Sequence, residues 1–181
     1  WLMVHVGIIT SSYGFFGLSA LISVISLVMF CIKPTTKIRD SIQELTIVNE
    51  MAAEIGLFAL TIGTFLGGIW ANESWGRYWS WDPKETWAFI SIIFYATILH
   101  FRMVPGLRGK WTFNVAGMWM IWTVIFTYFG VNYYLSGLHS YAAGDPMPIP
   151  NWIPITAGIM LALSIASYLR EQKYWRNTNG S

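Results

Sequence analysis

The sequence predicts an all-α polytopic membrane protein, a five-helix transmembrane bundle with an outward-facing tryptophan-rich segment. Two observations lead to this fold class. Hydrophobic side chains make up 55% of the 181 residues and charged ones 11%, whereas a soluble domain has about 25% charged residues. Nine of the eleven lysines and arginines follow the first, third and fifth apolar stretches. This composition excludes a soluble enzyme, a nucleic-acid binder (so no nucleic-acid partner is expected) and a disordered segment.

Five apolar stretches approach or exceed the roughly 20 residues that cross a bilayer. The first, residues 2–32, is longer than required, so one of its ends is expected to project beyond the lipid. The second, residues 51–70, contains four glycines, which let helices approach closely. The remaining stretches are 83–104, 111–135 and 153–169.

The positions of the positive charges set the direction of the chain. The nine cations that fall on one side are Lys33, Lys37, Arg39, Arg102, Arg108, Lys110, Arg170, Lys173 and Arg176. Only Arg77 and Lys84 fall on the other side. The positive-inside rule therefore predicts an external start and a cytoplasmic C-terminus. Because the chain starts at Trp1, we expect it to be the end of a longer membrane protein.

Residues 70–87 hold five tryptophans between the second and third stretches, on the predicted outer face. Asp82 is a good N-cap, Pro83 suits the first helical position and Glu85 completes a capping box, so the third helix is expected to begin here. Trp75 and Trp79 are four residues apart, so a short surface helix would place both on one face.

Two interpretations of this segment remain open from the residue types alone. Tryptophan is enriched at membrane interfaces, so the segment could be an aromatic belt. Alternatively, flat indoles with the cations Arg77 and Lys84 suit a planar apolar molecule with acidic edges, such as a porphyrin with two propionates.

The chain has three histidines, and each has an ordinary and a functional interpretation. His5 and His139, taken singly, are interfacial histidines; taken together, they flank the tryptophan segment on one face. A bis-imidazole haem needs two such histidines from opposing elements. His100 lies about 20 Å along the third helix from Trp87, in the inner half of the bilayer. At that depth an ionisable residue is either a functional candidate or a histidine bonded to a neighbouring helix.

The segment Trp-Gly-Arg-Tyr-Trp-Ser-Trp-Asp-Pro-Lys-Glu-Thr-Trp, residues 75–87, resembles the WWD signature of the haem-handling proteins of cytochrome c biogenesis. The Trp-Asp-Pro-Lys-Glu-Thr ending most resembles the CcsA (ResC) branch, the integral-membrane part of the System II cytochrome c synthase. The resemblance extends to His-Val at residue 5 and Gly-Leu-His-Ser-Tyr around residue 139, so it covers almost the whole chain.

The resemblance implies a single C-terminal-type CcsA membrane domain over residues 1–181, with 70–87 as the external WWD segment. It implies that b-type haem, bound non-covalently in transit, is delivered to the outer face of the cell inner membrane. There it is presented for thioether attachment to the Cys-x-x-Cys-His motif of an apocytochrome c. A CcsB/ResB-type subunit or fused domain is the expected partner. The thiolates come from the apocytochrome, so no catalytic nucleophile is expected in this chain.

The resemblance also assigns residues. His5 and His139 occupy the places of the two external haem-ligating histidines, and His100 that of a ligand to a second, intramembrane haem. The expected haem-handling side chains are Trp75, Trp79, Trp81, Trp87 and Asp82, with Arg77 and Lys84 as partners for the propionates.

Two other functions remain as alternatives. One is a haem chaperone or exporter of the CcmC/CcmF kind, although the Pro-Lys-Glu ending favours the synthase branch. The other is a haem b membrane anchor of a respiratory complex, which would need histidine pairs within facing spans rather than outside them.

Overall fold

The computed structural model describes residues 2–139 and 148–175, and within these ranges the chain is helical and contains no strand. The helices are α1 Leu2–Phe30, α2 Thr36–Trp75, α3 Pro83–Leu99, α4 Lys110–Ile125, α5 Val131–Tyr134 and α6 Trp152–Arg170. A 3-10 turn, η1 Phe101–Met103, follows α3, and π-helical turns η2 Phe126–Gly130 and η3 Glu171–Trp175 follow α4 and α6. The predicted all-α membrane bundle is confirmed.

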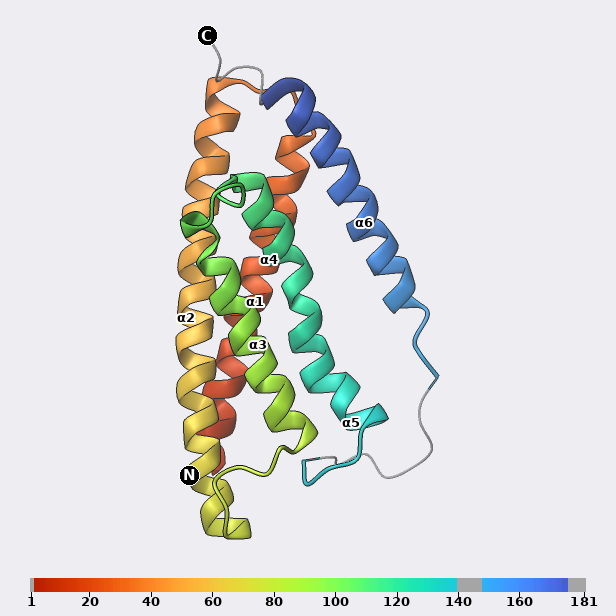
Figure 1. Ribbon diagram of the computed structural model, residues 1–181. Coiled ribbons are helices and arrows are strands. Elements are labelled where there is room, and N and C mark those ends of the chain that lie inside the picture. The colour runs from red at the N-terminus through yellow and green to blue at the C-terminus, as the bar shows by residue number, and fades with distance from the viewer. Residues whose placement is uncertain (1, 140–147, 176–181) are drawn as a thin grey trace.

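Four helical segments among the described residues are long and apolar enough to cross a membrane: Leu2–Phe30, Thr36–Trp75, Lys110–Tyr134 and Trp152–Trp175. The remaining long helix, α3, has seventeen residues and runs beside α2 and α4 (Figure 1). Successive long helices alternate in direction. The tryptophan segment and the start of α1 therefore share the lower end of the bundle in Figure 1.

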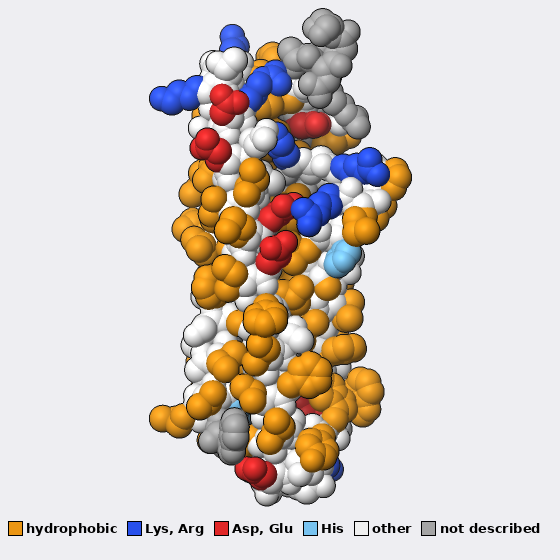
Figure 2. Space-filling view, turned by 90° about the vertical axis from the view of Figure 1, so that its left-hand side faces the viewer, with side chains coloured by type: hydrophobic (Ala, Val, Ile, Leu, Met, Phe, Trp, Pro, Cys, Tyr) orange, Lys and Arg blue, Asp and Glu red, His pale blue; other side chains and the backbone are white. Residues whose placement is uncertain are grey.

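Lysines and arginines gather at the opposite end. Figure 2 shows blue side chains concentrated over the upper part of the molecule and apolar side chains over most of the rest. This distribution is the one predicted for five passes. Arg176, the ninth predicted cation, lies outside the described residues.

The second helix differs from its prediction. It was expected over residues 51–70, but α2 is continuous over 40 residues, about 60 Å. It begins after the N-cap Thr35, whose hydroxyl accepts a hydrogen bond from the Ile38 N–H, and ends at Gly76 in the left-handed conformation (φ 71°). Hydropathy marks where a helix enters lipid and not where its hydrogen bonds end, which is why the charged first turns were missed.

The third helix, in contrast, is shorter than predicted. It begins at Pro83 as expected, with Asp82 and Glu85 forming the complete capping box. It ends at Leu99 instead of residue 104 and is followed by the 3-10 turn η1, and Pro105 disfavours helical geometry in the residue before it. Val104 is accordingly extended, with φ −98° and ψ 118°.

Helices α1 and α2 pack antiparallel through glycines on α2, in agreement with the predicted close contacts. A Cβ placed at Gly56 would lie 2.8 Å from the Phe16 ring, and one at Gly63 would lie 2.7 Å from Ile9. The glycines are seven residues apart, and so are their partners. Because glycine has no side chain, Phe16 and Ile9 fit against these two positions, and this fit sets the register of the two helices.

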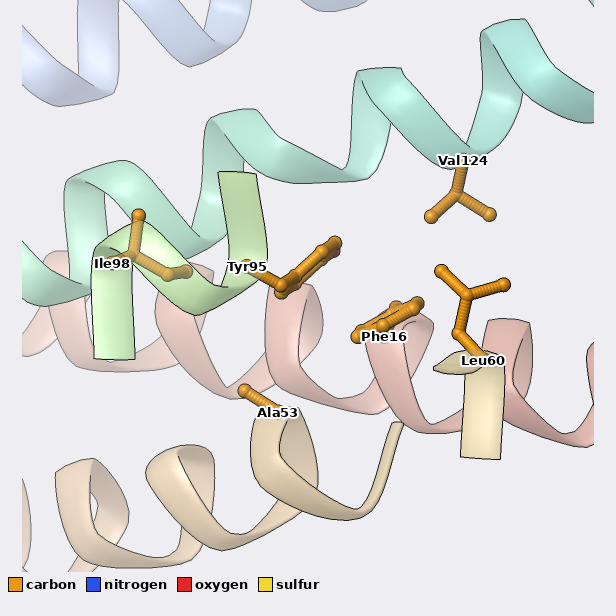
Figure 3. Packing of buried hydrophobic residues seen from close by; sticks show 6 residues of the cluster. All are labelled: Phe16, Ala53, Leu60, Tyr95, Ile98 and Val124. Atoms are coloured by element: carbon orange, nitrogen blue, oxygen red, sulfur yellow. The ribbon is translucent and has the colours of Figure 1, made fainter. Parts of the chain in front are cut away.

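The apolar core lies where α1, α2, α3 and α4 meet. Phe16 and Tyr95 are both fully buried and stack with ring centroids 3.7 Å apart (Figure 3). Ala53, Leu60 and Val124 pack around them. This stack joins the short helix α3 to α1, so it holds in place the helix whose first turn forms part of the site described below.

A buried polar network ties α1, α2 and α4 together on the cation-rich side of that core. Asn49 accepts a hydrogen bond from Ser19 (2.5 Å) and donates to Ser23 (2.8 Å) and to Asn114 (2.9 Å). Asn114 in turn donates to Thr46 at 3.0 Å. In a lipid-embedded bundle such bonds satisfy the amides internally and specify one arrangement of the three helices.

Helix α6 is attached to the outside of the bundle. Two α4 indoles donate hydrogen bonds to buried serines of α6, Trp111 to Ser167 at 3.0 Å and Trp119 to Ser164 at 3.1 Å. Most of the other α6 side chains are exposed on the protein surface, as suits a helix that faces lipid.

We expect Gly56→Ala to destabilise the bundle by about 1–3 kcal/mol, because the new methyl group would overlap the fully buried Phe16 ring. Gly14→Ala is the matched control, since a Cβ at Gly14 meets nothing within 4 Å. Thermal unfolding in detergent should show a lower midpoint for the first variant only. Equal midpoints would contradict the glycine-based register.

Candidate functional site

His5 and His139 meet at one cleft at the lower end of the bundle. His5 lies in the first turns of α1, whereas His139 lies in the segment that follows α5. The cleft encloses about 950 Å³ of empty space, including its open mouth, and both histidines line it together with Trp79 and Lys84. The predicted convergence of the two imidazoles over the tryptophan segment is therefore present in the fold.

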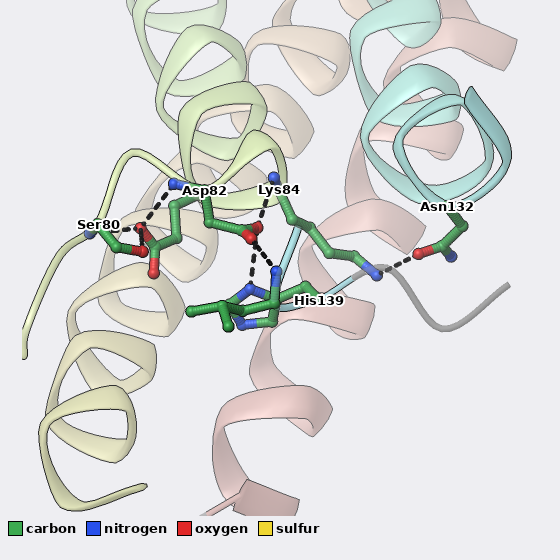
Figure 4. Close-up of polar contacts among 7 residues, drawn as sticks. Ser80, Asp82, Lys84, Asn132 and His139 are labelled. Atoms are coloured by element: carbon green, nitrogen blue, oxygen red, sulfur yellow. Dashed lines mark hydrogen bonds and ion pairs between the residues drawn. The ribbon is translucent and has the colours of Figure 1, made fainter. Parts of the chain in front are cut away.

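Asp82 holds His139 in place. Its carboxylate caps α3 by accepting from the Lys84 N–H at 3.0 Å, and it also accepts from the Leu138 N–H at 2.5 Å and from His139 Nδ1–H at 3.0 Å. Figure 4 shows this carboxylate between the start of α3 and the His139 ring. One side chain thus fastens the segment carrying His139 to the first turn of α3.

Close approach of these two segments depends on Gly137. A Cβ at that position would overlap the Asp82 carboxylate and lie 2.8 Å from Pro83 Cδ. The absence of a side chain at Gly137 lets the 135–139 backbone reach the α3 cap.

Asp82 is buried yet ionised. Burial acts to raise its pKa, but hydrogen bonds from the Lys84 N–H, from His139 and from the Leu138 N–H outweigh it, so the pKa of this carboxyl lies below its ordinary value of 3.8. A carboxyl with a lowered folded-state pKa stabilises fully above its ordinary pKa and loses this effect as pH falls through the lowered value. The link to His139 is therefore intact throughout the neutral range.

His5 is seated on α2. Its Nδ1–H donates to the Gly63 carbonyl at 2.7 Å. The imidazole occupies the space above Gly67, where a Cβ would lie 2.5 Å from His5 Cε1. The close packing of α1 on the α2 glycines therefore extends up to the cleft. His5 packs on Gly67, just as Ile9 packs on Gly63 and Phe16 on Gly56.

Both imidazoles have the same protonation pattern. A carbonyl and a carboxylate oxygen can only accept hydrogen bonds, so Nδ1 of His5 and of His139 each carries the proton. When either ring is neutral, its Nε2 keeps the lone pair. A bonded Nδ1–H with an unprotonated Nε2 is the arrangement in which proteins prepare histidine as a metal ligand.

The predicted tryptophans have different positions. Trp79 lines the cleft. Trp75 lies behind His139, with ring centroids 4.9 Å apart and planes at 84°. It is the last residue of α2, and residues 76–82 are not helical, so the expected short helix with Trp75 and Trp79 on one face is wrong. Gly76 ends α2 between them.

Trp81 and Trp87 lie away from the cleft lining. Trp81 is 70% exposed and has a positive φ of 59°, uncommon for a large side chain, and it contacts Trp79 edge-on. Trp87 packs against Phe126, with ring centroids 4.3 Å apart.

The two predicted propionate partners, Lys84 and Arg77, lie in different places relative to the cleft. Lys84 lines the cleft, and its ammonium donates to Asn132 of α5 at 3.1 Å (Figure 4). Arg77 is exposed and is not among the residues that line the cleft. Glu85 also lines it, but its carboxylate accepts from Ser80 and from the Asp82 N–H, which rigidifies the turn before α3.

His100 lies at the opposite end of α3, where it forms the C-cap. Its Nδ1–H donates to the Ala96 carbonyl at 2.6 Å, which leaves Nε2 as the nitrogen available to a ligand. The ring is exposed on the surface of the bundle. Among residues 2–139 and 148–175, no three His, Cys, Asp or Glu side chains gather as a metal site.

Several residues of the cleft were not predicted from the sequence. Trp70, Tyr78 and Tyr128 line the cleft beside the histidines. Trp70 is the first residue of the tryptophan segment, and the centroids of the Trp70 and Trp75 rings are 4.8 Å apart. Tyr128 is placed by the π-helical turn η2, and π turns often occur at functional sites. No pattern in the sequence indicates that turn.

The fold and the site together define an integral membrane helical bundle, in which two imidazoles with bonded Nδ1 atoms line an aromatic cleft at the end opposite most of its lysines and arginines. The chain belongs to the cytochrome c assembly protein family, whose model matches residues 1–139. The family resemblance carried by residues 75–87 is thereby confirmed.

Individual relatives agree with this family. The chain is 49% identical to protein NrfI of Wolinella succinogenes over 170 residues, 93% of this chain and 19% of that protein. It is 40% identical to cytochrome c biogenesis protein CcsA of Chlamydomonas reinhardtii over 145 residues, 78% of this chain and 40% of that protein. CcsA of Prochlorococcus marinus strain MIT 9301 is 36% identical over 168 residues, 78% of this chain and 53% of that protein. The chain thus spans between about a fifth and a half of these relatives.

We expect Asp82→Asn to release His139 while leaving α3 intact. Asparagine is a good N-cap when its one amide oxygen takes the place of Oδ2, which accepts from both the Lys84 N–H and His139. The Leu138 N–H, which bonds to Oδ1, then faces an amide NH₂ and loses its acceptor, at a cost of about 1.5–3 kcal/mol, and the His139 bond weakens because its acceptor is no longer charged. ¹⁵N NMR of the histidine ring in detergent should show loss of the fixed His139 tautomer.

Asp40→Asn, an exposed position on α2, is the control with the same charge change. An unaltered His139 spectrum in Asp82→Asn would show that the carboxylate does not orient the ring.

Proposed function

We propose that this chain is the haem-binding membrane component of a cytochrome c synthase, which holds haem at the outer face for attachment to an apocytochrome c. One observation carries the proposal. His5 and His139, from opposite parts of the chain, line one cleft, and each donates its Nδ1–H to a fixed oxygen. Family membership supports a role in cytochrome c maturation.

The residues of the cleft fit haem. Two neutral imidazoles with free Nε2 lone pairs are the axial ligands of a bis-histidine haem. Trp70, Trp79 and Tyr78 provide flat apolar surface for the macrocycle. Lys84 is the cation inside the cleft, so it, more than the exposed Arg77, would hold a propionate.

The chain acts in this proposal by positioning. Haem supplies the vinyl groups to which the cysteine thiols of the apocytochrome add. Asp82 and Gly63 keep both imidazoles in one tautomer, while the aromatic walls exclude water and orient the macrocycle. Trp75 supports the His139 ring from behind, and Trp81 and Trp87 act through their contacts with Trp79 and Phe126.

The cleft is assigned to the outer side of the cell inner membrane. It lies at the end opposite the cation-rich end, which the positive-inside rule places in the cytoplasm together with the C-terminus. Because the relatives are much longer than this chain, a CcsB/ResB-type subunit or fused domain is the proposed partner that completes the synthase.

His100 is proposed as a ligand to a second haem near the cytoplasmic end. Its Nδ1–H is fixed by the Ala96 carbonyl, and its ring is open to the surrounding membrane or to a partner. His5 and His139 occupy the other end of the bundle, so the second axial ligand is expected from another chain or from another part of the natural protein.

We expect His5→Ala and His139→Ala each to lose the bis-histidine haem spectrum of the purified full-length protein, and added imidazole to restore it by filling the space of the lost ring. Visible absorption spectra and haem content measure this result. His100→Ala is the matched control when haem is added to the purified proteins, because the added haem reaches the outer site without passing the inner one. This variant should therefore keep the outer bis-histidine spectrum without added imidazole. Unchanged spectra in both outer variants would remove the assignment.

We expect His100→Ala to abolish cytochrome c assembly although the outer histidines remain, because haem would no longer be held on its way to the outer site. The measurement is co-expression with an apocytochrome c and the CcsB-type partner, scored by covalent haem staining. Retained assembly would eliminate the inner site.

Haem bound at the outer site without attachment to any apocytochrome, even in the unmodified protein, would favour a haem chaperone over a synthase.

A further inference from the structure

A second cleft lies at the cation-rich end, between α2 and the connection from α3 to α4. It encloses about 610 Å³, including its open mouth. Three cations from one nine-residue stretch line it, Arg102, Arg108 and Lys110, and Glu50 is the one carboxylate in its described lining. The lining is therefore strongly positive.

The side chains that α2 contributes hold the cations around this cleft. The guanidinium of Arg102 lies 3.8 Å from the Glu50 carboxylate, and Lys110 Nζ donates to Gln43 Oε1 at 3.0 Å. Glu50 and Gln43 are two helical turns apart. The α2 partners of Arg102 and Lys110 are thus about 10 Å apart along the helix axis, and the exposed cations line the space between α2 and the α3–α4 connection.

The depth of the cleft matches the headgroup region of a bilayer. Glu50 immediately precedes the apolar stretch 51–70 of α2, and the turns before it carry charges. The polar headgroup layer adds about 5–7 Å on each side of the hydrocarbon core. The cleft therefore begins where hydrocarbon ends and extends outward through the phosphate level.

Exposed apolar side chains border the cations. Ile47 belongs to the lining, and Met51, Met103 and Val104 lie within two residues of lining residues along the chain; all four are between 44% and 68% exposed. The positive-inside rule accounts for the sign of the charge at this end, but not for a cleft with cations inside and apolar side chains at its rim. That combination suits a ligand with an anionic head and an acyl tail.

We propose that this cleft binds the headgroup of an anionic phospholipid, with its phosphate among Arg102, Arg108 and Lys110 and its acyl chains along the exposed apolar rim. The site is separate from the histidine cleft and does not depend on haem binding. A bound lipid would tie the α3–α4 connection to α2 at the level of Glu50.

The test titrates the detergent-solubilised full-length protein with phosphatidylglycerol and, separately, phosphatidylcholine, and counts bound lipids by native mass spectrometry. We expect one phosphatidylglycerol to bind preferentially. Arg102→Gln with Arg108→Gln should weaken that binding about 30-fold, since each cation near a membrane surface contributes about a five-fold effect. Arg102→Lys with Arg108→Lys should retain most of it, which separates loss of charge from loss of folding.

Lys33→Gln with Lys37→Gln is the matched control, because it removes two exposed cations from the same end outside the cleft. Equal weakening by both glutamine pairs would show that diffuse positive charge, not the cleft, attracts the lipid, and would overturn the proposal. Equal binding of phosphatidylcholine would overturn it as well. Displacement of phosphatidylglycerol by millimolar inorganic phosphate would reassign the cleft to a soluble anion.

Discussion

The Asp82 carboxylate is the contact on which the site depends. It caps α3 and accepts hydrogen bonds from the Leu138 N–H and from His139 Nδ1–H. One ionised group therefore joins the start of a helix, a loop and a candidate metal ligand. A buried carboxylate is costly unless its oxygens are satisfied, and three N–H donors provide that satisfaction. Because these donors come from two segments more than fifty residues apart, the ordering of the loop and the ionisation of Asp82 support each other.

Several parts of this arrangement could be predicted from sequence because they are local. The cap formed by Asp82, Pro83 and Glu85 needs only neighbouring residues, and the four helices that are long and apolar enough to cross a membrane can be located from hydropathy alone. The alternation of the helices and the gathering of cations at one end then followed from counting passes. His5 and His139 were placed on a common face by the same count, and the structure brings them to one cleft.

The remainder depends on contacts that local patterns do not reveal. The length of α2 was missed because its first turns are charged, although their backbone hydrogen bonds continue without interruption. Asp82 was assigned to the cofactor site, and only the fold shows that it contacts His139 at a distance of 57 residues along the chain. The contact of His5 with Gly63 and Gly67 has one signal in the sequence. The spacing of the α2 glycines equals the spacing of the α1 side chains that pack on them.

That matching also explains how a histidine near the start of the chain can be held accurately. Turning α1 by one residue rotates its side chains by about 100°, which would remove Phe16 from Gly56, Ile9 from Gly63 and His5 from Gly67 together. The Asn49 network fixes the same register from the other half of the bundle, since Ser19 and Ser23 of α1 both bond to Asn49 of α2. The position of His5 is thus set by packing and hydrogen bonds along most of α1, and only its final orientation is set at the cleft.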